Sequence, residues 1–170
     1  MREALARAAI AVGDCASASV LMLSDSALVD AVDAVHVLEQ QLASVMLGLV
    51  RELDGRGVPT AQGASSTVVW LRQRLRMSVS AARRLVELAS ALESGPPVLR
   101  DALSAGEVSV EQAQAIAACV AALPSEVGPD TVDKAATVLV GHAAEHDAIG
   151  LRRLGQRILE VVAPEVGEEL

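Results

Sequence analysis

The sequence has 170 residues, of which 52% are apolar, and a formal net charge of −8 at pH 7. This negative charge argues against a protein that coats nucleic acid or binds a membrane surface, and no uncharged apolar run approaches the roughly 18 residues of a membrane span. Since Phe and Tyr are absent and there is only one Trp, alanine, valine and leucine must fill the core, which disfavours an all-β fold.

Apolar residues at helical spacing, separated by capping residues and by Gly or Pro, predict an all-α protein, a helical bundle with a long N-terminal helix. Helices are expected at about residues 2–12, 25–53, 66–75, 79–92, 97–104, 110–122, 129–145 and 147–162. Gly13 and Asp14 are expected to end the first helix, and residues 58–64 to form a loop. We divide the chain into a partly helical segment 1–23, a single helical domain 24–163, and an acidic tail or start of a linker at 164–170.

Polar side chains mark several of the expected helix starts. Ser24 or Asp25 precedes the long helix, and Ser78 precedes the helix at 79–92, where a side-chain oxygen can accept a hydrogen bond from the backbone. Ser109 and Gln112 fit a capping box, in which Ser bonds forward and Gln bonds back. These residues therefore predict where three helices begin.

The longest expected helix, residues 25–53, carries a wide apolar stripe. Leu28, Val35, Leu42 and Leu49 recur every seven residues. Further apolar residues fill the same side of the helix: Val32, Leu38, Val45, Met46 and Leu53. We interpret the stripe as a surface that faces the core. A partner groove, or self-association through this helix, is the alternative.

Basic residues cluster in one part of the chain. Residues 65–92 hold five of the fourteen Lys and Arg residues and a single acid, Glu87, so this segment carries +4 and the rest of the chain −12. The only aromatic residue of the Phe, Tyr and Trp group, Trp70, lies in the same segment. Because thirteen of the fourteen bases are Arg and Asn is absent, as is typical of a GC-rich genome, only the clustering of the arginines is informative.

Two short amphipathic helices meet in this basic segment at residues 76–78, a spacing that suits an embedded helix-turn-helix-like pair. Their inner faces are expected to consist of Val68, Val69, Leu71, Leu75, Leu85, Val86 and Leu88. Arginines on the outer face could bind phosphate or the acceptor edge of guanine. The candidate nucleic-acid-binding residues are Arg72, Arg74, Arg76, Ser80, Arg83 and Arg84. A purely structural helix pair with solvated arginines is the alternative.

Residues 142–146 spell H-x-x-E-H, the inverted zinc-peptidase motif. On a helix, His142 and His146 would stand one turn apart and share a metal, with Glu145 as the base and Glu160 as a further ligand. Two histidines at this spacing also arise by chance, and a position near a helix end suits the helix dipole. We therefore expect no metal site and no metal catalysis.

Few other residues suggest chemistry. Arg152, Arg153 and Arg157 form a second basic patch, interpreted as a solvated face or as ion pairs to Glu145 and Asp147, with a second phosphate contact as the alternative. The sequence has no phosphate-binding loop, dinucleotide-binding glycine pattern or nucleophile–base pair. We therefore expect no catalytic residue, no cofactor and no small-molecule substrate.

The two cysteines lie far apart in alanine-rich segments, at Cys15 and Cys119. We interpret them as small apolar residues of a protein in the reducing cytosol. The N-terminus carries a faint export pattern, but Arg7 and Asp14 interrupt its apolar region. A cytoplasmic location is therefore expected.

Three blocks occur in order: TVVWLRQRLRMSVSAARRLVELASAL, LRDALSAGEVSVEQAQAIAACVAALP and GLRRLGQRILEVVAPE. The second block is the most informative, because a short helix ending at Gly106 is followed by Val108, Ser109 and a helix bearing Gln112 and Ile116. Together the blocks resemble the domain of unknown function 222, also called the 13E12 repeat family. The resemblance extends from about residue 28 to about residue 164.

The resemblance implies a domain that precedes an HNH endonuclease domain in actinobacterial proteins and has no established activity of its own. The HNH motif, with its paired histidines and zinc-binding cysteines, is absent from this sequence. No nuclease residue is therefore transferred to this chain. We expect a non-catalytic, DNA-associated helical module; a helical interaction or oligomerisation domain without nucleic-acid binding is the alternative.

Overall fold

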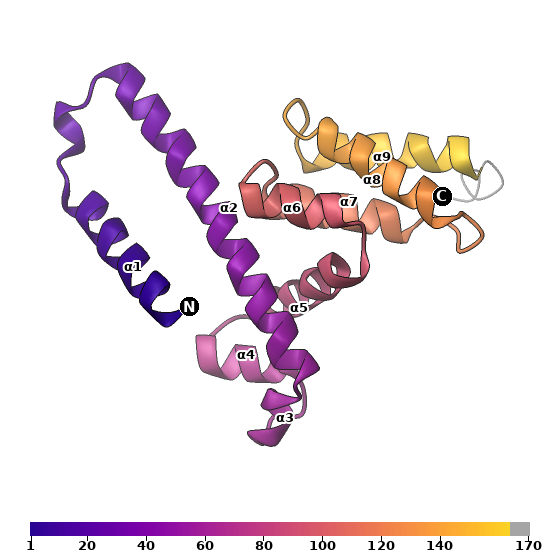
Figure 1. The fold of residues 1–170 in the computed structure, drawn as a ribbon, viewed down its shortest axis with the longest axis horizontal. Helices are drawn as coiled ribbons and strands as arrows, with labels where there is room; N and C mark the ends of the chain where they lie inside the picture. The colour runs from indigo at the N-terminus through magenta and orange to yellow at the C-terminus, as the bar shows by residue number, and fades with distance from the viewer. Residues whose placement is uncertain (164–170) are drawn as a thin grey trace. The chain divides into compact units, whose positions relative to one another are not determined.

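A computed structural model describes residues 1–163 of the chain (Figure 1). The elements are α1 (Arg2–Ser17), the 3-10 helix η1 (Val20–Met22), α2 (Asp25–Gly55), α3 (Val58–Ala61), α4 (Thr67–Leu75), α5 (Val79–Ser94), α6 (Pro97–Ala105), α7 (Val110–Ala121), α8 (Pro129–Gly141) and α9 (Ala148–Val162). These residues contain no strand, which confirms the predicted all-α fold. In the same residues, no helix combines the length and the apolarity that a membrane crossing requires. The predicted acidic tail, 164–170, lies outside the described residues.

The chain divides into two compact units, Met1–His36 and Val37–Leu170. The first unit holds α1, η1 and the first turns of α2, and none of its residues is buried. Helix α1 continues through Gly13 to Ser17, so its predicted end near residue 12 is wrong. A single Gly costs only about 1 kcal/mol in a helix interior, and the alanine-rich sequence around Gly13 is compatible with a continuous helix.

The second unit is built on a core of leucine, isoleucine and alanine side chains. Leu47, Leu71, Leu103, Ile116 and Leu151 are at most 2% exposed, and several alanines around them are fully buried. Helix α7 packs against α5, α6, α8 and α9, most extensively against α9. Small side chains allow these helices to approach closely, as the composition predicts.

The predicted helix starts are confirmed by their hydrogen bonds. The Oγ of Ser24 accepts from the amide of Ala27 at 3.3 Å, ahead of α2. The Oγ of Ser78 accepts from the amide of Ala81 at 3.1 Å, ahead of α5. The predicted capping box is present at α7: the amide of Gln112 donates to Ser109 Oγ at 3.2 Å, and the amide of Ser109 donates to Gln112 Oε1 at 2.8 Å.

The apolar stripe of α2 does not face the core. Leu28, Val35, Leu42 and Leu49 are 39%, 54%, 47% and 39% exposed, so the interpretation of the stripe as core-facing is wrong for these residues. Helix α2 instead buries Gln40, Leu47 and Val50, and Gln40 Oε1 accepts from the amide of Val110 at 2.9 Å. A repeat of apolar residues reveals an apolar helix face but not what covers it.

Two other boundaries differ from those predicted. The expected loop at 58–64 contains the short helix α3, which has proline in its first turn. Helix α8 ends at Gly141 rather than near residue 145, and His142 is its C-cap. Glycine is a poor helix former, and the chain turns before Asp147 caps α9. His142 and His146 therefore do not lie on one helix.

Candidate nucleic-acid interface

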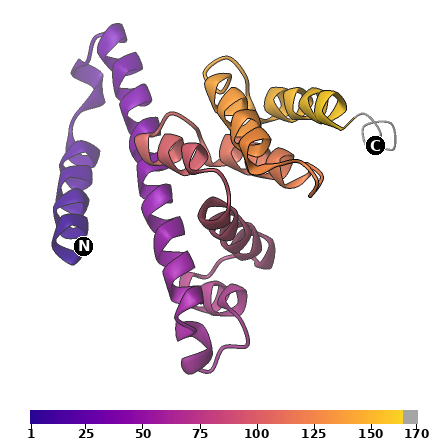
Figure 2. The ribbon, with the colours of Figure 1, turned by 45° about the vertical axis from the view of Figure 1, so that its right-hand side comes forward.

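The predicted basic helix pair is formed by α4 and α5, which pack against each other. Three residues separate them, and each begins at a serine cap, Ser66 and Ser78. Figures 1 and 2 show the pair beside the C-terminal half of α2 within the second unit. The pair therefore has the predicted arrangement of two short helices joined by a turn at residues 76–78.

The inner faces of the pair largely match the prediction. Leu71 and Leu88 are 1% and 3% exposed, and Val68, Leu85 and Val86 are partly buried against the same core. Val69 is also partly buried. The prediction for Leu75 is wrong: this residue ends α4 beside the turn and is 45% exposed.

The six candidate binding residues lie between the last turn of α4 and the second turn of α5. We call them the arginine surface: Arg72, Arg74, Arg76, Ser80, Arg83 and Arg84. All six are exposed, which confirms the predicted exposure of Ser80, Arg83 and Arg84. Among residues 1–163, none of the five arginines forms an ion pair, whereas Arg51, Arg56 and Arg100 each pair with a carboxylate.

Two members of the arginine surface have contacts that orient them. The guanidinium of Arg74 lies over the ring of Trp70, 5.1 Å from its centroid, and the indole Nε1 of Trp70 donates to Gln62 Oε1 at 2.8 Å. The hydroxyl of Ser80 lies 3.1 Å from that of Ser78. A stacked Arg keeps its fork of donors available for an anion.

Arg76 has a backbone conformation that the sequence did not predict. It follows the last residue of α4 with φ 58° and ψ 31°, and it is the one non-glycine residue with positive φ within 1–163. This left-handed conformation costs an L-residue about 1–2 kcal/mol, and glycine is common in the turn of a helix-turn-helix. The tight turn requires the conformation, while the side chain adds a positive charge there.

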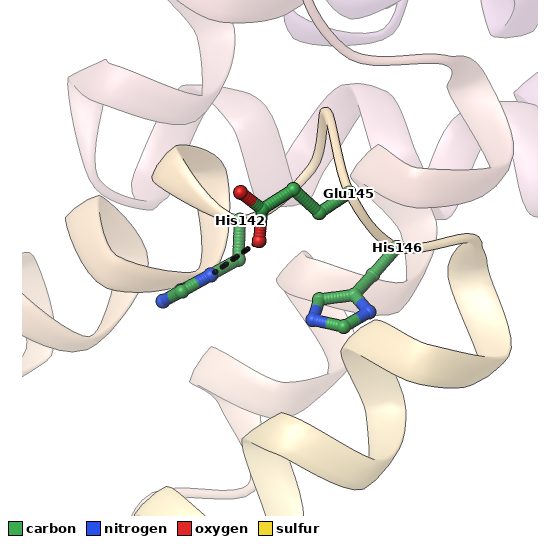
Figure 3. A group of neighbouring side chains, drawn as sticks. All are labelled: His142, Glu145 and His146. Carbon is green, nitrogen blue, oxygen red and sulfur yellow. Dashed lines mark ion pairs between the residues drawn. The ribbon is translucent and has the colours of Figure 1, made fainter.

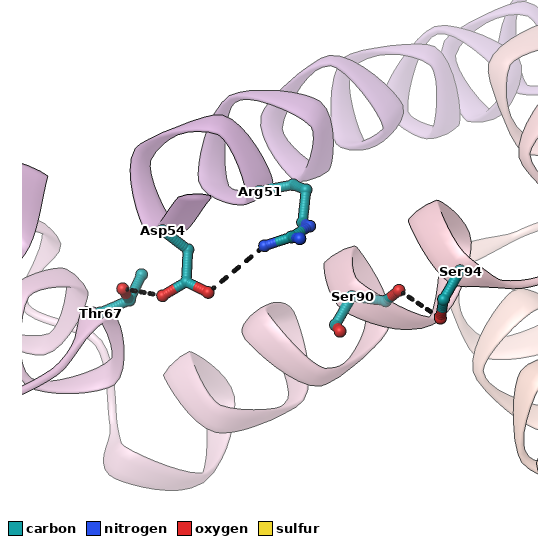
Figure 4. A network of polar contacts seen from close by, with 5 residues as sticks. All are labelled: Arg51, Asp54, Thr67, Ser90 and Ser94. Atoms are coloured by element: carbon teal, nitrogen blue, oxygen red, sulfur yellow. Dashed lines mark hydrogen bonds and ion pairs between the residues drawn. The ribbon is translucent and has the colours of Figure 1, made fainter. Parts of the chain in front are cut away.

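The position of α4 is fixed by a polar contact with the end of α2 (Figure 4). The hydroxyl of Thr67, which is buried, donates to the carboxylate of Asp54. The same carboxylate pairs with Arg51 at 3.6 Å. On α5, Ser94 Oγ donates to the carbonyl of Ser90 at 3.0 Å. Because Thr67 is the first residue of α4, its hydrogen bond to Asp54 anchors the start of α4 to the end of α2. This contact stabilises the helix pair that carries the arginine surface.

The second basic patch is solvated. Arg152, Arg153 and Arg157 are exposed on α9, and within the described chain no ion pair joins them to Glu145 or Asp147. Glu145 pairs instead with His142, and Asp147 Oδ1 accepts from the amide of Gly150 at 2.7 Å. The interpretation as a solvated face holds, and the predicted ion pairs are not formed in the described residues.

Cys119 is half-buried between α7 and α9, where its burial raises the pKa of the thiol, and the nearby Arg152 opposes that rise only in part. A raised pKa keeps the thiol protonated and weakly nucleophilic. Cys15 is exposed on α1. The prediction of a small apolar role therefore suits Cys119, whereas Cys15 is not a core residue.

Sequence reasoning missed the polar residues that hold the helices together. Gln40 and Asp54 are not in any recognisable motif, yet one joins α2 to α7 and the other joins α2 to α4. The sequence neighbours of Gln40 are also polar, Glu39 and Gln41, so no signal in the sequence singles it out. His142, Glu145 and His146 form the one cluster of potential metal ligands found in the described residues.

The comparisons with known proteins identify a family and little else. The model of the family described as "Domain of unknown function (DUF222)" matches residues 29–169. No curated protein and no solved structure gives a significant match to the chain.

Proposed function

The chain belongs to the domain of unknown function 222 family, and within that family we propose that it is a non-catalytic, DNA-associated helical module. Its arginine surface would contact DNA, and in full-length relatives the module would position an HNH nuclease domain on its target. The observation that carries the proposal is the set of five exposed arginines that have no carboxylate partner among residues 1–163 of this acidic chain. These arginines can bind phosphate without first breaking an ion pair to a carboxylate.

The location of these charges supports a contact with the DNA backbone. Arg83 and Arg84 lie in the first two turns of α5, close to the positive end of the helix dipole. Arg72, Arg74 and Arg76 flank the same turn from the α4 side. In a helix-turn-helix, the N-terminal part of the second helix enters the major groove, so Arg83 and Arg84 would lie at the groove and, like the other arginines, bind the phosphates that line it.

The conformation of Arg76 gives independent support. A strained residue that a glycine would relieve is a reason to look for a functional side chain at that position. In Arg76→Gly we expect unchanged or slightly higher stability and weaker DNA binding. Loss of binding together with loss of fold would instead assign Arg76 a structural role.

The decisive experiment is a fluorescence anisotropy titration of a labelled DNA duplex at two salt concentrations. With about four phosphate contacts, the affinity should fall about 100-fold between roughly 50 and 200 mM salt. The variant Arg83→Ala/Arg84→Ala should bind at least about 10-fold more weakly at low salt, and its salt slope should be smaller by about two.

The matched control removes the same amount of positive charge elsewhere. Arg56→Ala/Arg100→Ala replaces two arginines that already pair with Glu52 and Asp101, so it should retain most of the affinity of the parent. If the Arg83/Arg84 variant binds as tightly as the parent, or if the control loses as much affinity, the proposal fails.

A second candidate function is a helical interaction or oligomerisation module, in which α2 pairs with the α2 of a second copy. The observation that favours it is the exposure of Leu28, Val35, Leu42 and Leu49 on α2. Apolar residues at a spacing of seven suit a seam between two helices.

A further inference from the structure

Three potential metal ligands converge at the turn between α8 and α9 (Figure 3). His142 is the C-cap of α8, and His146 lies just before Asp147, the N-cap of α9. One ligand atom from each of His142, Glu145 and His146 lies within 4.8 Å of the other two. His142 Nδ1 is 3.7 Å from Glu145 Oε2, and the centroids of the two rings are 5.9 Å apart.

One side chain, that of Gln112, holds the backbone of this turn by two hydrogen bonds. Gln112 Nε2 donates to the carbonyl of Ala143 at 2.7 Å and to that of His146 at 2.8 Å. Gln112 is itself fixed in the capping box of α7. Two hydrogen bonds from one amide to carbonyls three residues apart hold the residues that flank Glu145 in place. The three side chains thus project from an ordered turn, and not from a free loop.

The start of α9 leaves space for the ring of His146. A Cβ on Gly150 would lie 3.1 Å from the Cβ of His146 and 3.3 Å from its Cγ and Nδ1. The His146 ring therefore packs directly over the first turn of α9, and the missing side chain at Gly150 permits this. Packing of this kind limits the rotamers of His146 and keeps its nitrogens near the other two ligands.

We propose that His142, Glu145 and His146 form a surface binding site for a divalent transition metal of the zinc class. Two imidazole nitrogens and a carboxylate oxygen are donors that suit zinc, whereas calcium and magnesium prefer oxygen donors alone. In a tetrahedral zinc site the ligand atoms lie about 3.3–3.5 Å apart. All three side chains are exposed, so modest rotations, mainly of His142 and Glu145, would bring the ligand atoms from the present spacing to that one.

This arrangement differs from the helical motif that the sequence spells. There, both histidines lie on one helix and the glutamate is a base; here, the histidines flank a turn and Glu145 pairs with His142. Glu145 is thus a ligand, and the metal would join the end of α8 to the start of α9. Three protein ligands leave one tetrahedral position to water or to an external donor. The site is independent of the arginine surface and of its proposed contact with DNA.

Calorimetric titration of the metal-free protein with zinc chloride tests the site. We expect one zinc per chain and a rise in the melting temperature that a chelator reverses. His142→Ala/His146→Ala removes two of the three ligands and should weaken zinc binding by more than about 10-fold, the lower end of what the loss of a residue that merely orients a ligand costs. Circular dichroism of this variant without metal should match that of the parent, because both side chains are exposed.

Two control variants separate this site from other possible ligands. The chain has three histidines, and His36→Ala removes the third one without altering the turn. Cys15→Ser removes the exposed thiol of α1. Both variants should bind zinc as the parent does. The proposal is overturned if the His142/His146 variant retains the affinity of the parent, if either control abolishes binding, or if the parent binds no zinc.

Discussion

The hydroxyl of Thr67 is buried where α4 meets α2, and it donates to the carboxylate of Asp54. A buried polar group that loses its partner costs about 1–3 kcal/mol. We therefore expect Asp54→Ala to lower the free energy of unfolding by about this amount, as measured by urea denaturation. The arginine surface is supported by this contact, so DNA binding should also weaken as α4 loosens.

The control for Asp54 is Glu52 on the same helix. Glu52 pairs with Arg56 and both side chains are exposed, and such surface pairs contribute at most about 1 kcal/mol. Glu52→Ala should therefore have the smaller effect. In Asp54→Ala/Thr67→Val the penalty of the unpaired hydroxyl disappears, so the two substitutions should not be additive. Additive effects would show that the hydrogen bond contributes nothing to stability.

Helices α7 and α9 pack so closely at Gly155 that a side chain at this position would push against Cys119 of α7. A Cβ on Gly155 would lie 2.2 Å from the Sγ and 2.7 Å from the Cβ of Cys119. The Sγ could rotate away, but the Cβ is fixed to the backbone, so the helices would have to separate. Overpacking of this kind costs about 1–3 kcal/mol, which exceeds the gain of up to about 1 kcal/mol from placing Ala in a helix. Gly155→Ala should thus destabilise the protein.

The control for Gly155 is another helical glycine, Gly48 of α2, which has nothing within 4 Å of an added Cβ. Gly48→Ala should raise the free energy of unfolding by up to about 1 kcal/mol, because only the helix propensity changes. Urea denaturation of both variants provides the comparison. If Gly155→Ala also stabilises the protein, the close approach of α7 and α9 is not a constraint on the fold.

At the scale of the helices, the features that depend only on neighbouring residues could be predicted from the sequence. Ser78 and the Ser109–Gln112 capping box predicted helix starts correctly, because a cap depends on a few neighbouring residues. The predicted end of α8 was wrong, because where a helix ends also depends on contacts with distant residues. Here Gln112 holds the turn that follows α8 by hydrogen bonds to the carbonyls of Ala143 and His146. The cluster of potential metal ligands, His142, Glu145 and His146, follows from that turn. Its residues could be predicted, but its geometry could not.

At the scale of the whole molecule, composition predicted helices and close packing, but the role of the α2 stripe could not be derived from its spacing. Periodicity identifies an apolar face, and whether another helix covers it depends on contacts between residues distant in the sequence. The exposure of Arg83 and Arg84 was easier to predict. Charged side chains are almost never fully buried unless they are paired, and the segment has only one acid, Glu87.

The exposed stripe leads to a prediction about assembly. If α2 pairs with a second copy, sedimentation equilibrium should show an average mass that rises with protein concentration toward that of a dimer. Leu42→Glu/Leu49→Glu should remain monomeric, because a charge at a helix–helix seam is desolvated without a partner. The matched control is Val138→Glu/Ile149→Glu, which changes two apolar residues of α8 and α9 that are 45% and 56% exposed, and it should still associate.

The same samples discriminate between the two candidate functions. A parent protein that stays monomeric over the whole concentration range contradicts the assembly role and leaves the arginine surface as the basis of function. A parent that dimerises through α2 and shows no salt-dependent affinity for DNA supports the interaction module instead. A dimer that binds DNA would present two arginine surfaces, and linking two weak sites raises the affinity for one duplex only if both can reach it. In that case Leu42→Glu/Leu49→Glu should weaken DNA binding although it leaves all five arginines in place.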